Sequence, residues 1–216
     1  MKRYKLISFV LVWLVFIAII LGTEFANKSL EFSLISEEPR KGGIECFDIS
    51  ETEKIAIGKN GINDKILVYD INGNYLYGYK FNTDGTFFVE WENELLNVYL
   101  VRGSTRVTLD SLGNIINRLD LSEEEFNTKL EKISSVEKER LGTKVKLEKG
   151  ENFFSLLSTS YSKISASIDG GGKSIIYDGN TLVLIDSILH WVLIGGMFVA
   201  VVGYFLIAFI KYKSKE

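Results

Sequence analysis

Two stretches decide the fold of this chain, KILVYDINGNYLYGYKF at residues 65–81 and TRVTLDSLGNIINRLDL at residues 105–121, which align without a gap at an offset of 40 residues. In each, an apolar run rich in β-branched and aromatic residues enters an Asp-x-x-Gly sequence, and a second such run leaves it. Asp can accept hydrogen bonds from the backbone of such a turn, and Gly takes a positive φ without steric cost. The stretches therefore predict two equivalent β-hairpins. The expected turn residues are Asp70, Gly73, Asp110 and Gly113.

A third copy of the turn is expected in IDGGGKSIIYDG, residues 168–179, where Asp169 and Gly172 occupy the same frame. It follows the second copy by 59 residues, which exceeds the 40-residue period by 19. The Gly-Lys-Ser sequence in it is not expected to be a phosphate-binding loop. Ser167 stands where the first glycine of such a loop is required, and the following residues favour a strand rather than a helix.

The surplus matches a predicted helix at residues 122–140, SEEEFNTKLEKISSVEKER. Ser122 and Glu125 have the spacing of a capping box, and three glutamates crowd the first turn, where the helix dipole favours them. Phe126, Leu130 and Ile133 form one apolar stripe. We therefore expect this helix to lie on the surface of the repeat units.

Each repeat unit is expected to contain four short antiparallel strands, which is typical of a β-propeller blade. The expected strands are 44–50, 53–59, 65–70 and 75–81 in the first unit, 86–92, 94–102, 106–110 and 115–121 in the second, and 143–149, 153–159, 162–168 and 173–179 in the third. Residues 28–36 can add one more strand. The expected fold is thus an all-β domain of about three propeller-like antiparallel meanders with one inserted helix.

The lines KILVYDINGNYLYGYKF and SKISASIDGGGKSIIYDG resemble repeats of bacterial membrane-anchored β-propellers of the NHL or YVTN type, over residues 44–180. The resemblance implies a meandering all-β fold that is used for binding, and it carries over no catalytic residue. Propellers close with about four to eight blades. With about three units, the domain is expected either to form an open curved sheet or to complete a ring with another chain.

Two uncharged segments, residues 6–22 and 187–210 with its single His190, have the length and composition of transmembrane helices. The first lacks a small-x-small cleavage pattern and is expected to be retained as an anchor. Basic residues stand outside both segments, which predicts cytoplasmic termini and an extracytoplasmic middle domain. These basic residues are Lys2, Arg3, Lys5, Lys211, Lys213 and Lys215. The expected organisation is a tip and span at 1–22, a linker at 23–43, the β domain at 44–182, a span at 183–210 and a tail at 211–216.

The composition of the middle segment argues against several functions. From Thr23 to Leu182 the chain has 26 acidic and 19 basic residues, so no nucleic-acid partner is expected. Cys46 is the single cysteine and His190 the single histidine, too few for a catalytic triad or a zinc site. A hydrolase would have only scattered carboxylates as catalytic groups. Polar residues at alternating positions of a half-exposed strand are expected without any catalytic role. These carboxylates are Glu90, Glu92 and Glu94.

Small residues in the two spans are expected to permit helix packing. They are Ala18 and Gly22 in the first span, and Gly196, Ala200 and Gly203 in the second. Asp186 and His190 are interpreted as an anchor at the membrane interface rather than a proton relay. We therefore expect no catalytic residue, metal or cofactor. The expected function is a membrane-anchored binding or assembly module that recognises another envelope protein or itself, with an accessory subunit of a transporter or membrane enzyme as the alternative; the sequence leaves any small-molecule ligand open.

Overall fold

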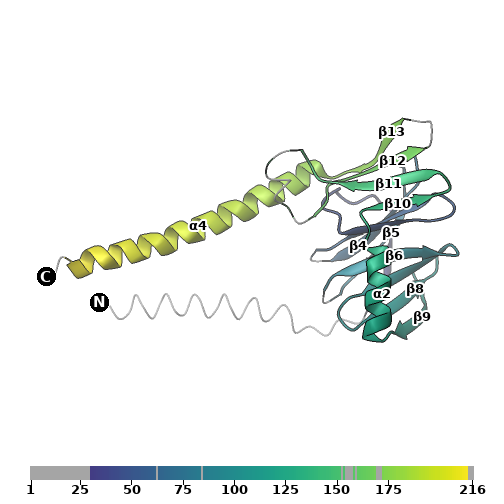
Figure 1. Cartoon of the computed structure of the whole chain (residues 1–216), viewed down its shortest axis with the longest axis horizontal. Helices are drawn as coiled ribbons and strands as arrows, with labels where there is room; N and C mark the ends of the chain where they lie inside the picture. The colour runs from purple at the N-terminus through teal and green to yellow at the C-terminus, as the bar shows by residue number, and fades with distance from the viewer. Residues whose placement is uncertain are drawn as a thin grey trace.

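The computed structural model of the chain describes residues 30–61, 63–83, 85–151, 153, 158, 160–168 and 172–213. They form three antiparallel sheets, a surface helix and one long helix that leaves the sheets on one side (Figure 1). The expected first span, residues 6–22, lies outside the described residues. The fold is therefore mostly antiparallel β-sheet with one long apolar helix.

Each of the three sheets is built mainly from strands that follow one another along the chain. Sheet 1 has the order β1-β5-β4-β3-β2, sheet 2 the order β6-β7-β8-β9, and sheet 3 the order β10-β11-β12-β13. Sheet 1 contains β1 (Ser33–Ile35), β2 (Cys46–Ile49), β3 (Ile55–Lys59), β4 (Asp64–Tyr69) and β5 (Tyr75–Phe81). Sheet 2 contains β6 (Phe87–Glu92), β7 (Leu95–Leu100), β8 (Thr105–Leu109) and β9 (Ile115–Asp120). Sheet 3 contains β10 (Glu137–Arg140), β11 (Thr143–Glu148), β12 (Lys163–Ile168) and β13 (Lys173–Asp178).

Sheets 1 and 2 confirm the expected strands, since β2 to β9 coincide with them to within a few residues. The additional strand expected within residues 28–36 is β1, which pairs with β5 at the edge of sheet 1. The hairpins β4–β5 and β8–β9 also share a register shift one residue from the turn, at Tyr69 and at Leu109. These two hairpins therefore share their backbone geometry.

Sheet 3 corrects two expectations. The helix predicted over 122–140 is α2 (Glu123–Ile133), and residues 137–140 are the strand β10. The apolar stripe ends at Ile133 because the next position on that face is Glu137. The strand expected at 153–159 has no place between β11 and β12, which pair directly; of that segment only Phe153 and Ser158 are described, and neither is in a strand.

The start of α2 has the capping box that the sequence predicts. The backbone N–H of Glu125 donates to Ser122 Oγ (3.3 Å), and the backbone N–H of Ser122 donates to Glu125 Oε2 (3.1 Å). Phe126 and Ile133 are buried against Tyr99 of sheet 2. This helix therefore covers the face of sheet 2 that is turned away from sheet 1.

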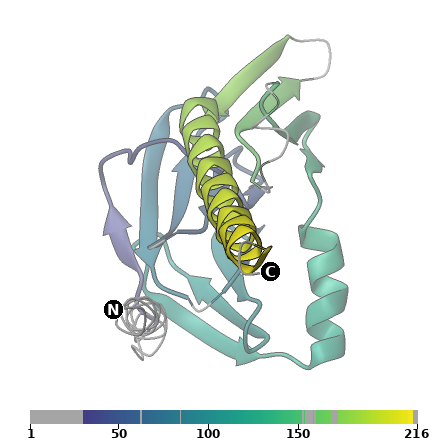
Figure 2. The same ribbon diagram turned by 90° about the vertical axis from the view of Figure 1, so that its left-hand side faces the viewer.

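Sheet 1 lies between the other two sheets. One apolar cluster joins it to sheet 2 through residues such as Val68 and Val98, and another joins it to sheet 3 through residues such as Ile57 and Ile164. Viewed along the long helix, the sheets fan out from one another and do not close into a ring (Figure 2). The described residues therefore show no propeller closure, because apolar clusters join sheet 1 to each of the other two sheets but none joins sheet 2 to sheet 3.

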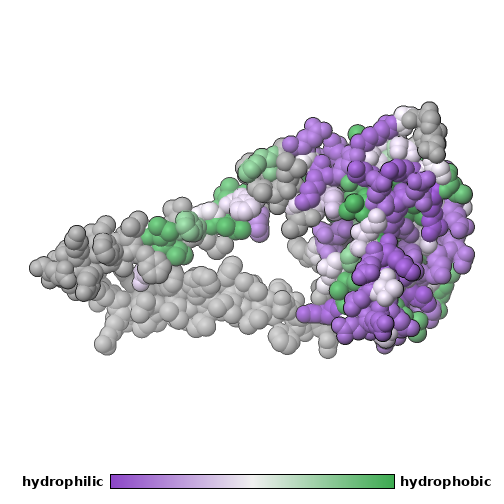
Figure 3. Space-filling view, in the orientation of Figure 1, coloured by the Kyte–Doolittle hydropathy of each residue, from purple (hydrophilic) through white to green (hydrophobic). Residues whose placement is uncertain are grey.

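The long helix α4 (Asn180–Lys213) continues directly from sheet 3. Its first turn is fixed to the domain by the buried side chain of Val183. Beyond this turn apolar side chains are exposed, for example Phe198 at 69%, and they stand out on the helix in Figure 3. The segment Asn180–Tyr204 has 25 residues and a mean hydropathy of 2.0, so it is long and apolar enough to cross a membrane.

Candidate binding surface

The turn between β8 and β9 is held by the carboxylate of Asp110. Its Oδ1 accepts hydrogen bonds from the backbone N–H groups of Leu112 (2.9 Å) and Asn114 (2.8 Å), and Oδ2 accepts one from Asn114 Nδ2 (2.8 Å). Gly113 takes a φ of +84°. The side-chain bond from Asn114 is the main cause that holds the pKa of Asp110 below its ordinary value. Asp110 therefore shapes the turn as an ionised acceptor.

The turn between β4 and β5 repeats this geometry. Asp70 Oδ1 accepts from the backbone N–H groups of Asn72 (2.9 Å) and Asn74 (2.8 Å), and Oδ2 accepts from Asn74 Nδ2 (2.7 Å). Gly73 has a φ of +85°. Of the third turn, Asp169 lies outside the described residues, and a Cβ at Gly172 would meet no described residue within 4 Å.

Both described turns also make contacts between sheets. The Tyr79 hydroxyl of sheet 1 donates to the Asp110 carbonyl (3.1 Å), and a Cβ at Gly113 would lie 2.9 Å from the Tyr79 ring. A Cβ at Gly73 would lie 3.0 Å from the carbonyl oxygen of Ile176 in sheet 3. The glycines therefore serve both the turn and the close approach of the neighbouring sheet.

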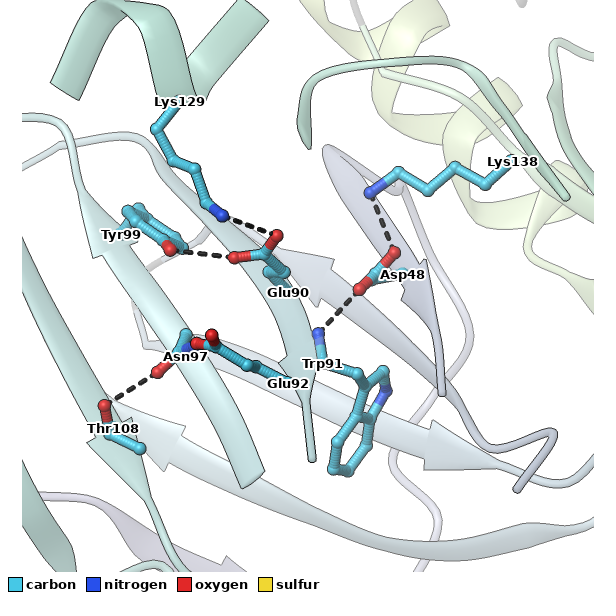
Figure 4. Close-up of polar contacts among 9 residues, drawn as sticks. All are labelled: Asp48, Glu90, Trp91, Glu92, Asn97, Tyr99, Thr108, Lys129 and Lys138. Atoms are coloured by element: carbon cyan, nitrogen blue, oxygen red, sulfur yellow. Dashed lines mark hydrogen bonds and ion pairs between the residues drawn. The ribbon is translucent and has the colours of Figure 1, made fainter. Parts of the chain in front are cut away.

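Asp48 joins all three sheets (Figure 4). Its Oδ1 accepts from Lys138 Nζ of β10 at 3.0 Å, and its Oδ2 accepts from the backbone N–H of Trp91 of β6 at 2.6 Å. The side chains of Asp48 and Lys138 are 5% and 13% exposed. A buried carboxylate needs such partners, because burial without them is costly. This contact fixes the arrangement of the sheets.

Glu90 joins helix α2 to sheet 2. Its Oε1 pairs with Lys129 Nζ at 2.8 Å, and its Oε2 accepts from the Tyr99 hydroxyl at 2.8 Å (Figure 4). The ring of Tyr99 lies 6.3 Å from that of Phe126. Glu90 is therefore held in a structural contact.

The two neighbouring glutamates are also engaged. Glu92 accepts from Asn97 Nδ2 at 2.9 Å, and Glu94 accepts from Lys54 Nζ at 2.9 Å. Thr52 Oγ1 donates to the same oxygen of Glu94 at 2.6 Å. Each of these two carboxylates is thus held by neighbouring side chains.

The pKa values of two further groups, one buried and one half-buried, are shifted by their surroundings. Burial raises the pKa of the Cys46 thiol to about 12, and burial lowers the pKa of Lys59 to about 8. Lys59 Nζ donates to the Arg40 carbonyl at 2.9 Å and lies 5.7 Å from the centre of the Tyr177 ring. Among the described residues, no three His, Cys, Asp or Glu side chains are grouped to hold a metal ion.

The small-residue face of the expected second span lies on α4. A Cβ at Gly196 or Gly203 would meet nothing within 4 Å among the described residues. Ala200 lies in the same helix, whereas Ala18 and Gly22 fall outside the described residues. Asp186 and His190 both lie in α4, where the His190 and Trp191 rings are 6.3 Å apart.

The surface that stands out is the outer edge of sheet 2. All six residues of β9 are exposed, and within the described part of the chain β8 is the only strand that pairs with β9. Several exposed side chains on and beside this strand are apolar. They are Leu112 (68%), Ile115 (41%), Ile116 (52%) and Leu119 (44%). An exposed strand edge with apolar side chains is a template for pairing with another chain.

An open curved sheet, one of the two forms expected from the sequence, has exposed edges, but the sequence does not say which edge lacks a neighbouring strand. The 40-residue repeat shows why: β5 and β9 are equivalent in sequence position. β1 pairs along the edge of β5, and the turn of sheet 2 contacts Tyr79 of β5, whereas no described segment pairs with the outer edge of β9. Whether a distant segment pairs with a strand cannot be read from the sequence of that strand alone.

Comparison of the chain with protein-family models, curated proteins and solved structures finds no match.

Proposed function

We propose that this protein is a membrane-anchored, non-catalytic binding or assembly module that recognises another envelope protein or itself. The observation that carries the proposal is the open edge of β9 with its exposed apolar side chains. Through this edge a partner can add a strand to sheet 2 and gain backbone hydrogen bonds and apolar contact together.

The membrane anchor is the best supported part of the proposal. Helix α4 projects from the sheets with its apolar side chains exposed, which is favourable in lipid and unfavourable in water. With a second span at residues 6–22 and basic residues outside both spans, the termini are cytoplasmic and the β domain is extracytoplasmic. The domain is then an open, propeller-like fan that offers its edges to partners.

A binding role also agrees with the contacts of the charged side chains. Asp48 and Glu90 join sheets and helix, and Asp70 and Asp110 hold turns. Their partners are supplied within the chain, so these groups are used for structure. This arrangement favours binding through an exposed surface.

The proposal is tested with the full-length chain in its native membrane, solubilised in mild detergent and separated by native electrophoresis. We expect the wild type to migrate as part of a complex and the double variant Ile116→Ser/Leu119→Ser to migrate outside it. Ile175→Ser is the matched control, because Ile175 is 57% exposed on the edge strand of sheet 3. A wild type that migrates alone, or a control that dissociates equally, would contradict the proposal.

The same experiment addresses the accessory-subunit alternative. The open space at Gly196 and Gly203 is the observation that favours it, because small residues let another membrane helix approach closely. Dissociation by Gly196→Leu/Gly203→Leu, with the β9 variant still in the complex, would replace the edge-binding proposal by the alternative.

A further inference from the structure

We infer that the partner at the β9 edge is a second copy of this chain, joined by antiparallel pairing of β9 with β9 around Leu119. This inference rests on the proposed function and specifies its partner. Four observations carry it: the direction of the free backbone groups, the charges on β9, the apolar residue between them, and the state of the other sheet edges.

The backbone of β9 determines which residues can pair outward. Leu121 N–H donates to the Ser104 carbonyl of the preceding turn (2.9 Å), and Leu119 stands opposite Arg106 in the ladder. Because backbone groups alternate in direction along a strand, those of Leu119 and Leu121 point toward β8. The groups of Arg118 and Asp120 therefore point to the outer side, where no described strand bonds them, and they can bond a second strand.

The charges of β9 are self-complementary in one register. When two β9 strands pair antiparallel with Leu119 opposite Leu119, each Arg118 stands opposite Asp120 of the second copy. Opposite charges in this position stabilise a strand pair. Arg118 forms no hydrogen bond or ion pair with any described residue, and Asp120 bonds only Thr105 Oγ1, at 2.7 Å, among the described residues. Both charges are thus available to a second copy.

The apolar residues support the same register. Leu119 is 44% exposed and would meet its own copy at the centre of the pair, where the Cα atoms of a non-hydrogen-bonded pair lie about 4.5 Å apart. Ile116, 52% exposed, would lie at the end of the paired segment. The pairing would therefore cover apolar surface that is otherwise in water.

The outer edges of the other two sheets, β1 and β13, lack the combination of available charges and a central apolar residue that β9 has. The strand β1 has only three residues. On β13 the charges already have partners, since Lys173 Nζ lies 2.6 Å from Glu148 and Asp178 lies 3.6 Å from Lys163 Nζ. In the view along α4, the strand that leads into α2 lies at the periphery of the domain (Figure 2). A copy anchored beside it in the same membrane can therefore reach β9.

Cysteine cross-linking tests the register in the full-length protein in its membrane. Leu119→Cys is expected to form an intermolecular disulfide on mild oxidation, because the paired Cα atoms fall in the range of about 4.4–6.8 Å that a disulfide needs. Asn117→Cys is the exposed control and should stay monomeric. Native Cys46 is buried and should not interfere. Cross-linking of Arg118→Cys in preference to Leu119→Cys would overturn this register.

A charge exchange tests the pairing without oxidation. Arg118→Asp and Asp120→Lys each place like charges opposite one another, and each should weaken the dimer by roughly tenfold in mild detergent. The double variant Arg118→Asp/Asp120→Lys restores opposite charges and should recover the dimer. Light scattering gives the mass, and circular dichroism checks that each variant is folded. A monomeric wild type, or a double variant weaker than both single variants, would contradict the inference.

The outcome also separates this inference from the proposed function. If Leu119→Cys does not cross-link but Ile116→Ser/Leu119→Ser still loses its membrane complex, the edge binds a different protein and the second copy is excluded. If neither variant has an effect, both proposals fail.

Discussion

At the scale of single residues, Asp48 has a structural role that its sequence context does not indicate. It stands in the apolar run IECFDIS, where a lone carboxylate on a strand indicates a solvent-facing position. In the folded chain it is 4% exposed and is bonded from sheets 2 and 3. Its role is therefore created by residues far from it in sequence.

Replacing Asp48 tests this role. Asp48→Asn keeps an acceptor for the Trp91 N–H but leaves Lys138 as a buried charge without its partner, so we expect the unfolding free energy to fall by about 3 kcal/mol or more. Glu51→Gln is the matched control: it removes an exposed contact between sheets 1 and 3, the 3.8 Å pair with Arg140, and should cost less than about 1 kcal/mol. Urea denaturation of the full chain in detergent measures both; equal costs would show that Asp48 has no special role.

At the scale of elements, the β-hairpin turns combine local and distant requirements. Gly113 takes a positive φ because of the turn. This requirement is local, and the Asp-x-x-Gly sequence predicts it. The same residue lies against the Tyr79 ring, a contact with another sheet that the sequence does not indicate. One glycine thus satisfies two constraints of different range.

These two constraints can be separated by substitution. Gly103 also has a positive φ (+98°), but a Cβ there would meet only Thr105 Oγ1 at 3.7 Å. Gly103→Ala should therefore cost about 1–2 kcal/mol of stability from backbone strain. Gly113→Ala should cost about 1–3 kcal/mol more, because its Cβ would also displace the ring of Tyr79. Similar denaturation midpoints for the two variants would show that the sheet contact is unimportant.

The helix α2 and the strand β10 show the limits of pattern reading at this scale. The capping box and the stripe through Phe126 and Ile133 located the helix correctly. Residues 137–140, four charged residues in a row, look like more exposed helix. They form a strand because they pair with β11, with Glu137 Oε1 2.6 Å from Lys144 Nζ. A partner strand, rather than local preference, decides their conformation.

At the scale of the whole molecule, a domain of three sheets is joined to the long apolar helix α4. The single cysteine makes the proposed topology testable, because Cys46 is buried and burial raises its thiol pKa to about 12. A thiol that remains protonated reacts slowly with maleimides. The wild type should therefore give a low background.

Labelling of intact cells then reports which side of the membrane the domain occupies. Leu112 is 68% exposed, so Leu112→Cys should react with a membrane-impermeant maleimide without permeabilisation, at least tenfold more than the wild type. Mass spectrometry or gel shift measures the labelled fraction. Labelling that appears only after permeabilisation would place the β domain on the cytoplasmic side and contradict the topology.

The features that depend on near neighbours in the chain could be predicted from the sequence. These are the turns at Asp70 and Asp110, the strands of sheets 1 and 2, the start of α2 and the apolar helix α4, because a turn, a cap or an apolar stripe involves residues only a few positions apart.

Three features depend on long-range contacts and appear only in the folded chain: sheet 1 lies in the middle, Asp48 is buried, and β9 has no second partner strand among the described residues. Asp48 meets Trp91 and Lys138 across sequence separations of 43 and 90 residues. β5 and β9 have the same place in the repeat, yet β1 covers only the first. Burial and exposure at these sites depend on which distant segments arrive there, and no residue carries that information in its own neighbourhood.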